Sequence, residues 1–268
     1  MKKILLLTSR NNLKNKNCIK ITNYLNKKSI NYQHIDINID IDEFKNIKYN
    51  TNSLILSFGG DGTALKAMKL GWKYKLDVLS FGPGRVGYLV RSLNEFNNLI
   101  DQWARGKYTF VKRFPIIQNE DLDLPAFNEV VIIKNSPTRL LDLSILTYDQ
   151  KVDFRADGII ISTSLGSTAY NYSAGGPIVH NDIDSIIITP ISPFTKFPRS
   201  IVVSRDTKLD ITIKKNQNFA IQFDGSVEVE ECINKNLTYK YGLSKKAIKI
   251  IGDDNNLKLD KFLNQILR

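Results

Sequence analysis

A short glycine-rich segment has the clearest chemical potential in this sequence. Gly59, Gly60 and Gly62 flank Asp61, Thr63 follows, and an apolar run precedes them. Glycine lets the backbone turn sharply and approach a ligand closely. A loop of this kind that leads into a helix offers free N–H groups to phosphate oxygens. The segment therefore predicts a phosphate-binding loop, with Thr63 capping the helix that follows.

Asp61 is unexpected in an anion-binding loop, because its carboxylate repels phosphate. Its presence suggests either acceptance of a proton from an attacking hydroxyl group or retention of a divalent metal ion. The spacing alone also fits an ordinary Gly-Asp-Gly turn. The segment is not a Walker loop, because no Gly-Lys-Ser/Thr follows, and it lacks the glycine spacing of the dinucleotide-binding fingerprint.

A second group of polar residues occurs further along the chain. Asn128 and Glu129 place an amide and a carboxylate side by side, where they can accept hydrogen bonds from ribose hydroxyls or an adenine amino group. A polar pair that merely begins a strand is the alternative. Arg155 and Asp157 precede a buried run and could contact a phosphate and an amide or ribose, respectively.

Residues 162–177 combine six Ser or Thr residues and three glycines with Tyr170 and Tyr172. Small residues beside aromatic faces suit a site where a flat heterocycle stacks and the backbone comes close. His180 raises the possibility of a hydrolase with Ser167 or Ser173. No G-x-S-x-G elbow exists, so we expect a structural role for His180.

The elements that position these residues differ between the two parts of the chain. Apolar runs at 2–8, 32–37, 53–58 and 77–81 alternate with helical patterns at 13–28, 64–70 and 94–106, which predicts a parallel sheet. Beyond residue 106, β-branched segments separated by turns predict an all-β module, with one or two helical turns at 167–173. These strands are predicted at 128–133, 141–148, 158–162, 185–189, 201–203, 209–213 and 219–223.

We therefore predict a Rossmann-like α/β domain at residues 1–107 and a sandwich-like β domain at 108–249. A tail at 250–268, with a helix from Leu259, is expected to pack on the first domain.

Composition limits the class of protein. The 268 residues include 42% hydrophobic residues, which excludes wholesale disorder. Two cysteines, Cys18 and Cys232, exclude a disulfide framework and indicate a reducing compartment, where we expect buried thiols. No apolar run approaches the roughly 20 residues of a membrane-spanning helix, and the apolar start is too short for a signal peptide. We expect a cytoplasmic protein without a membrane partner.

The chain is basic, with 38 Lys and Arg against 27 Asp and Glu and a formal net charge of +11. Clustered cations would suggest binding to a nucleic-acid backbone. Here the basic residues are scattered, which favours a solvated surface over a nucleic-acid partner.

Together, the motifs at 59–63, 128–129, 157–158, 166–170 and 173–177 resemble those of the NAD kinase family. The resemblance runs from about residue 54 to 225. The block at 166–177 is its most specific part, because lipid kinases of the same superfamily share the first motif. Asn128-Glu129 and the segment 81–89 resemble the eukaryotic branch. Residues 163–165 depart from the family by reading Thr-Ser-Leu instead of Thr-Pro-Thr, so this loop lacks a stiff proline.

The resemblance implies a phosphotransferase that converts ATP and NAD to ADP and NADP. It implies that Asp61 is the general base for the adenosine ribose 2′-hydroxyl, and that Mg²⁺ or another divalent cation accompanies ATP. The donor phosphates would face Gly59, Gly60, Gly62 and Thr63. NAD would meet Asp61, Gly62, Asn128, Glu129, Arg155, Asp157, Thr168, Ala169, Tyr170 and Ser173. A homo-oligomer, dimer or tetramer, is also implied.

Two other functions remain open at this point. A lipid kinase would share the glycine loop but would need an apolar acyl channel, which the hydroxyl-rich segment at 163–173 does not suggest. A catalytically inactive dinucleotide-binding protein would not need Asp61.

Overall fold

The computed structural model describes residues 2–83, 87–119, 125–194 and 199–253, which fall into two compact units. Unit 1 comprises the described residues up to Arg113 and those from Lys246 onward, and unit 2 runs from Phe114 to Lys245. These divisions differ from the predicted boundaries after 107 and 249. The physical reason is that strands β5 (Phe110–Arg113) and β17 (Ile248–Ile251) pair with each other in the sheet of unit 1. The predicted tail helix lies outside the described residues.

Unit 1 is an α/β domain, as predicted. Its sheet has the order β2-β1-β3-β4-β17-β5. The first four strands and β17 run parallel, and β5 is antiparallel. The four leading strands are β1 (Lys3–Thr8), β2 (Asn31–Asp36), β3 (Leu54–Phe58) and β4 (Asp77–Phe81).

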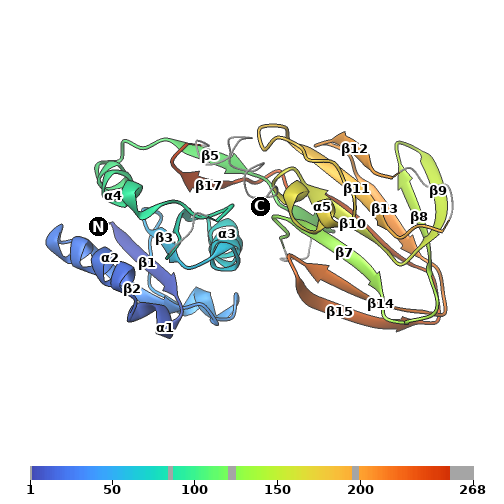
Figure 1. The fold of residues 1–268 in the computed structure, drawn as a ribbon, viewed down its shortest axis with the longest axis horizontal. Helices are drawn as coiled ribbons and strands as arrows, with labels where there is room; N and C mark the ends of the chain where they lie inside the picture. The colour runs from blue at the N-terminus through green and yellow to red at the C-terminus, as the bar shows by residue number, and fades with distance from the viewer. Residues whose placement is uncertain (1, 84–86, 120–124, 195–198, 254–268) are drawn as a thin grey trace. The chain divides into compact units, whose positions relative to one another are not determined.

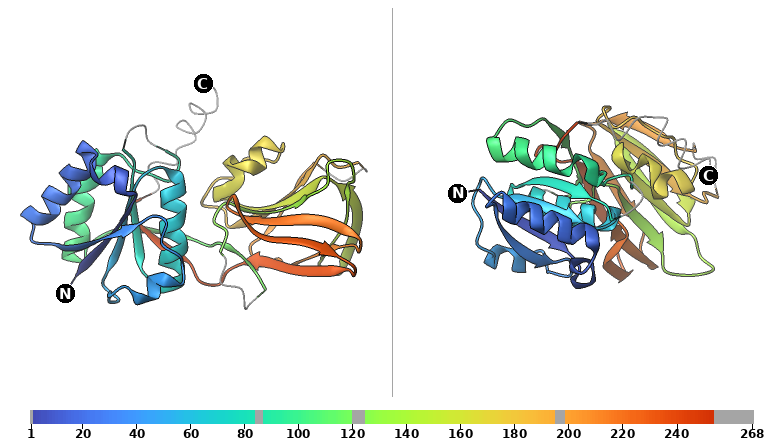
Figure 2. Two further views of the ribbon diagram at one scale, coloured as in Figure 1. Left: turned by 90° about the horizontal axis from the view of Figure 1, so that it is seen from below. Right: turned by 60° about the vertical axis from the view of Figure 1, so that its left-hand side comes forward.

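Helices cover both faces of this sheet. Helices α2 (Lys16–Lys27) and α4 (Phe96–Arg105) lie on one face and α3 (Asp61–Tyr74) on the other (Figures 1 and 2). The buried side of α4 consists of Phe96, Leu99, Ile100 and Trp103, which confirms the helical spacing read from the sequence. Shorter elements are α1 (Arg10–Leu13), η1 (Glu43–Asn46) and η2 (Leu93–Glu95). Within the described part of the chain, no helix is long and apolar enough to cross a membrane.

Unit 2 is a sandwich of two antiparallel sheets around one apolar core, as predicted. The sheets have the orders β12-β11-β10-β7-β14-β15 and β6-β16-β13-β8-β9. Between β10 and β11 the chain forms η3 (Leu165–Thr168) and α5 (Tyr170–Ser173), at the predicted helical turns. The strands are β6 (Ile116–Gln118), β7 (Glu129–Lys134), β8 (Leu141–Thr147), β9 (Gln150–Ala156), β10 (Gly158–Thr163), β11 (Ser185–Ile191), β12 (Ile201–Ser204), β13 (Leu209–Ile213), β14 (Gln217–Phe223), β15 (Ser226–Ile233) and β16 (Leu237–Leu243).

Candidate functional site

The glycine-rich segment forms a tight turn between β3 and α3. Gly60 is the N-cap of α3, and the helix begins at Asp61. The prediction that Thr63 caps this helix is wrong, because Thr63 lies inside the first turn and is buried. Its side chain packs over Gly59, where a Cβ atom would come within 2.2 Å of the Thr63 Oγ1. A 14-residue helix therefore starts directly at the loop, with its N-terminal amides and its dipole available to an anion.

The Asp61 carboxylate is held by the segment that follows β4. Its Oδ2 accepts the N–H of Tyr88 and its Oδ1 that of Leu89, both at 2.9 Å. Gly87 lies so close that a Cβ atom there would meet the Asp61 Oδ1 at 2.4 Å. An ionised carboxylate offers about four acceptor positions. The two backbone contacts therefore fix Asp61 and still leave positions for a ligand hydroxyl.

The loop lies where the topology of unit 1 favours ligand binding. The connection after β1 leads to β2 on one side of the sheet, whereas the connection after β3 leads to β4 on the other side. Such a switch point between β1 and β3 opens a crevice at the carboxyl ends of the strands. The ends of β1 and β3 are joined here, since the Thr8 Oγ1 donates to the Phe58 carbonyl at 2.6 Å. Asn12 donates to the same carbonyl at 3.5 Å.

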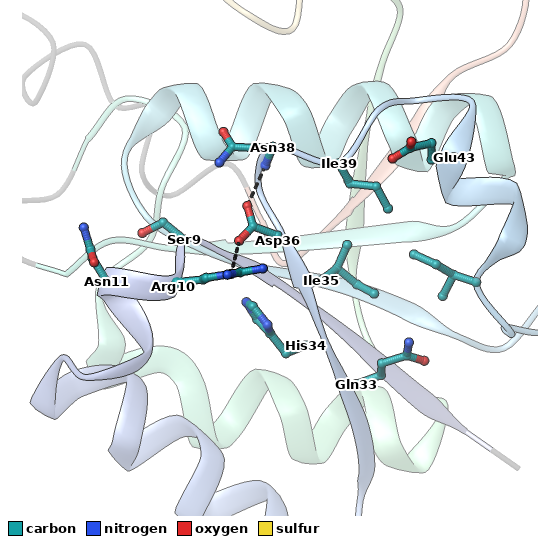
Figure 3. A pocket seen from close by; sticks show the side chains of 11 residues that line it. Ser9, Arg10, Asn11, Gln33, His34, Ile35, Asp36, Asn38, Ile39 and Glu43 are labelled. Atoms are coloured by element: carbon teal, nitrogen blue, oxygen red, sulfur yellow. Dashed lines mark hydrogen bonds and ion pairs between the residues drawn. The ribbon is translucent and has the colours of Figure 1, made fainter.

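A cavity of about 720 Å³ lies at the carboxyl ends of β1 and β2 (Figure 3). Asp36 accepts the N–H of Asn38 at 2.9 Å and forms an ion pair with Arg10 at 3.4 Å. Ile35 and Ile39 supply an apolar side. The remaining lining residues are Ser9, Asn11, Gln33, His34, Glu43 and Ile47. None of the residues predicted to bind a ligand lines this cavity.

In unit 2, Glu129 begins β7 and its side chain is buried. The backbone N–H of Tyr170 hydrogen-bonds its carboxyl group, so two residues predicted for one site lie together. Burial, and secondly the negative charge of Asp224, raise the pKa of Glu129 to about 7, against the opposing effect of the Tyr170 hydrogen bond. The Glu129 Oε2 atom has no hydrogen-bond partner among the described residues.

The segment that carries Thr168, Ala169, Tyr170 and Ser173 is fixed from within by Asn171. The Asn171 side chain is fully buried and donates to the carbonyls of Ser167 and Pro177 at 2.9 and 3.0 Å. It also accepts the Thr189 hydroxyl at 2.7 Å. Around this anchor, Tyr170 and Ser173 are exposed and Thr168 and Ala169 half-buried, so these side chains are accessible to a ligand.

Arg155 and Asp157 are not brought to Glu129 within the chain. In the pairing of β7 with β10, Glu129 lies opposite Ser162, whereas Gly158 at the other end of β10 lies opposite Ile133. Four residue steps along a strand correspond to roughly 13 Å. Arg155 forms an ion pair with Asp142 at 3.1 Å, and Asp157 with Lys134 at 2.5 Å. Their predicted contact with the dinucleotide stays a prediction.

In the described part of the chain, the hydrogen bonds and ion pairs do not join His180 to Ser167 or Ser173, so the serine hydrolase alternative has no structural support. His180 contacts Asp182 at 3.6 Å, and the Ser167 hydroxyl bonds the Val179 backbone. Cys18 is a buried free thiol, as expected.

Sequence reasoning missed Asp224, whose carboxylate binds the backbone at 127–129. The Asp-Gly pair at 224–225 is a hairpin signal that marks the turn. No local signal points to a partner almost one hundred residues earlier in the chain.

Comparison with known proteins gives the same family for both units. The model of the ATP-NAD kinase N-terminal domain matches residues 2–108, and that of the ATP-NAD kinase C-terminal domain matches residues 127–251. A bifunctional NADP phosphatase/NAD kinase of Methanocaldococcus jannaschii is 38% identical over 191 residues, which are 68% of this chain and 33% of that protein. An NAD kinase of Clostridium beijerinckii is 31% identical over 241 residues, 85% of this chain and 83% of that one.

The fold agrees with these matches. The crystal structure of an NAD kinase from Archaeoglobus fulgidus in complex with ATP superposes with a TM-score of 0.78 at 22% identity, over 98% of this chain and 99% of that one. The chain spans about a third of the bifunctional relative's length. The resemblance to a eukaryotic branch stays a prediction, since both of these relatives are prokaryotic.

Proposed function

Because the chain belongs to the ATP-NAD kinase family, we propose that it phosphorylates the adenosine ribose 2′-hydroxyl of NAD with ATP to give NADP and ADP. The observation that carries this proposal is the match of both family domains. In each domain, the side chains of the polar motif are held in place by contacts with neighbouring residues. In unit 1 an aspartate begins a helix at a glycine turn, and in unit 2 a buried glutamate meets Tyr170.

In this reaction Asp61 acts as the general base. The ribose 2′-oxygen attacks the γ-phosphorus, the bond from that phosphorus to the ADP oxygen breaks, and the 2′-hydroxyl proton passes to the Asp61 carboxylate. The backbone amides of Tyr88 and Leu89 orient the carboxylate for this transfer. The donor phosphates bind the N-terminal amides of α3, where Gly59, Gly60 and Gly62 keep side chains out of their path.

Mg²⁺ is the divalent cation that we propose for the donor. Among the described residues, no group of three or more His, Cys, Asp or Glu side chains could hold a metal ion. Mg²⁺ commonly keeps several waters and binds through substrate phosphates, a donor set that ATP itself provides. The cation would neutralise charge on the phosphates.

Tyr170 is proposed to stack on the adenine of NAD. Its ring is exposed and its backbone bonds Glu129. Tyr170→Ala is expected to weaken NAD binding by roughly 1–3 kcal/mol, the range found for base–aromatic stacking. Calorimetric titration with NAD measures this loss. The matched control is Tyr172→Ala, which removes another exposed ring from the same short helix and should leave the affinity nearly unchanged. Equal effects of the two variants would remove Tyr170 from the site.

The cavity at β1 and β2 is the place that we propose for the nucleoside of ATP (Figure 3). Ile35 and Ile39 offer an apolar surface to the base, and the Asp36 carboxylate can accept ribose hydroxyls. This cavity is two strand positions from the glycine loop, a separation of roughly 10 Å that the triphosphate can span.

Ile39→Asp tests the nucleoside site, since it adds charge to the apolar side. We expect about tenfold weaker ATP binding, equivalent to about 1.4 kcal/mol, and unchanged binding of inorganic tripolyphosphate. Calorimetry with both ligands measures the difference. Ile19→Asp, on the exposed side of α2, is the control and should bind ATP like the wild type. Parallel losses for ATP and tripolyphosphate, or none for ATP, would contradict this placement.

The activity itself is tested by incubating the purified protein with NAD, ATP and Mg²⁺ and measuring NADP. Formation of NADP supports the proposal. No NADP and no NAD binding, together with phosphorylation of a diacylglycerol, would instead favour the lipid kinase. NAD binding without turnover, with any donor, would favour an inactive dinucleotide-binding protein. A homo-oligomer and a cytoplasmic location remain our predictions.

A further inference from the structure

Asp224 lies in the turn between β14 and β15, at a φ of 51°. Its carboxylate accepts three successive backbone N–H groups, from Phe127 at 3.0 Å, Asn128 at 2.7 Å and Glu129 at 3.3 Å. Its own N–H donates to the Glu129 carbonyl at 3.0 Å. A non-glycine residue at positive φ is uncommon and often marks a functional constraint. These four contacts tie one side of the segment 127–129 to the turn.

The other polar groups of the same segment are bound by β10. The Phe127 carbonyl accepts the Thr163 hydroxyl at 2.6 Å. The Asn128 carbonyl accepts the Thr163 N–H at 2.9 Å and the Ser162 hydroxyl at 3.1 Å. Every backbone N–H and carbonyl from Phe127 to Glu129 thus has a partner. The backbone is fixed, and the Asn128 and Glu129 side chains are left to meet a ligand.

The Glu129 carboxyl group has one oxygen that can still accept a hydrogen bond from a ligand. Its Oε2 atom is buried and has no hydrogen-bond partner among the described residues. A buried polar atom without a partner costs free energy, which a ligand donor can recover. The Asp224 carboxylate is the charged group that acts on Glu129, and the Tyr170 N–H is the dipole that acts on it from the α5 side.

We propose that Asp224 is a positioning residue of the dinucleotide site, which holds Asn128 and Glu129 in place and whose negative charge makes NAD binding depend on pH. This inference rests on the proposed function of Asn128 and Glu129 as NAD ligands. Asp224 touches the backbone of these residues rather than the substrate, so it acts through them.

The direction of the pH effect follows from the chemistry of the carboxyl group. Ribose hydroxyls and the adenine amino group are donors, and an ionised carboxylate accepts them best. Glu129 loses its proton near pH 7, because burial and Asp224 raise its pKa to about 7. NAD should therefore bind more tightly as the pH rises through 7. Without the charge of Asp224, the pKa of Glu129 falls and the transition moves to lower pH.

The first experiment needs no ligand and no activity. Carboxyl-carbon NMR follows the titration of Glu129 in the wild type and in Asp224→Asn, with Ser162→Ala as the control. Asp224→Asn should move the midpoint downward by about half a pH unit or more, whereas Ser162→Ala, which loses one bond to the Asn128 carbonyl but no charge, should leave it in place. An unmoved midpoint in Asp224→Asn would overturn the role of its charge.

The second experiment measures the Kd of NAD by calorimetry from pH 5.5 to 8.5. At pH 8.5, Asp224→Asn should bind NAD about tenfold more weakly, because an asparagine can accept at one oxygen only. In this variant, the midpoint of the rise in NAD affinity between pH 5.5 and 8.5 should lie at a lower pH than in the wild type. Wild-type affinity in Asp224→Asn at every pH would overturn the positioning role.

Glu129→Gln keeps the inference testable if Asp224→Asn does not fold. This isosteric variant removes the titrating group, so its NAD affinity should not change between pH 6 and 8, whereas that of the wild type should rise. The same pH dependence in both proteins would overturn the inference. Failure of the wild type to bind NAD at any pH would be a failure of the proposed function, and the NMR titration separates the two cases.

Discussion

Asp61→Asn is expected to lower kcat by roughly 10²- to 10⁴-fold, the contribution typical of a general base. Asparagine keeps the size and one oxygen of the side chain but cannot accept the 2′-hydroxyl proton. Because the loss belongs to the transition state, the Kd of NAD should change little. Steady-state rates of NADP formation and calorimetric NAD binding, measured on the same preparation, give both quantities.

The backbone contacts of Asp61 make a folding control necessary. Its two oxygens each accept an N–H, from Tyr88 and from Leu89, and asparagine can satisfy only one of them. We expect a loss of about 1 kcal/mol in the free energy of unfolding, measurable by urea denaturation.

Asp77→Asn is the matched variant for this test. Asp77 begins β4, at the end of the strand away from the glycine loop, and accepts the Tyr108 hydroxyl at 2.7 Å. Asparagine at position 77 can still accept the Tyr108 hydroxyl, so Asp77→Asn should lose less stability than Asp61→Asn and should keep its turnover. Comparable turnover in both variants would exclude Asp61 as the base. Parallel losses of NAD affinity and kcat in Asp61→Asn would make it a binding residue instead.

The secondary structure that packing alone dictates was predictable from the sequence. Strands β4 and β13 occur at the residues expected, because continuous or alternating apolar side chains define them. Among the described residues, six strands were missed: β5, β6, β9, β15, β16 and β17. Of these, β9, β15 and β16 contain charged residues such as Lys151, Glu230 and Lys240 among their apolar ones, so their pattern is weaker. They form because the neighbouring strands offer unpaired backbone groups.

Helix boundaries depended on side-chain geometry that the sequence does not express. A threonine before a helical run is a good N-cap candidate, yet α3 begins at Asp61 and places Thr63 against Gly59. The close approach of these two residues explains why the loop needs a glycine at its first position. The prediction of a helix at an anion-binding turn did not depend on this detail.

The candidate site was predictable where its residues are near in sequence, and not where they meet across the chain. The segment at 166–173 was identified by its composition, and its fixed point, Asn171, is buried among its own neighbours and Thr189. Asp224 was missed because its contacts with 127–129 join strands far apart in sequence. Such contacts arise from the register of β7 and β14, which composition cannot specify.

The second large effect is expected when Gly166 is replaced by a larger residue. Its α-carbon packs so closely against the Asn128 backbone that there is no room for a side chain. A Cβ atom there would lie 2.1 Å from the Asn128 carbonyl oxygen and 2.4 Å from its carbon, both backbone atoms fixed by Ser162 and Thr163. Neither atom can rotate away, so Gly166→Ala must displace the segment that carries Asn128 and Glu129. Overpacking of this kind typically costs roughly 1–3 kcal/mol in the free energy of unfolding.

The same displacement should weaken NAD binding by at least about tenfold, since a shift of about 1 Å in a positioned group can cost about 100-fold. Gly242→Ala is the matched control in unit 2, because a Cβ atom there would meet chiefly the flexible end of Lys208, at 3.0 Å from its Nζ. Urea denaturation and NAD titration of both variants separate lost stability from lost binding. If Gly166→Ala loses stability but binds NAD like Gly242→Ala, the contact serves folding alone. If it loses both, the glycine of the 166–177 block is required because it allows the Asn128 backbone to pack directly beneath the ligand-binding segment.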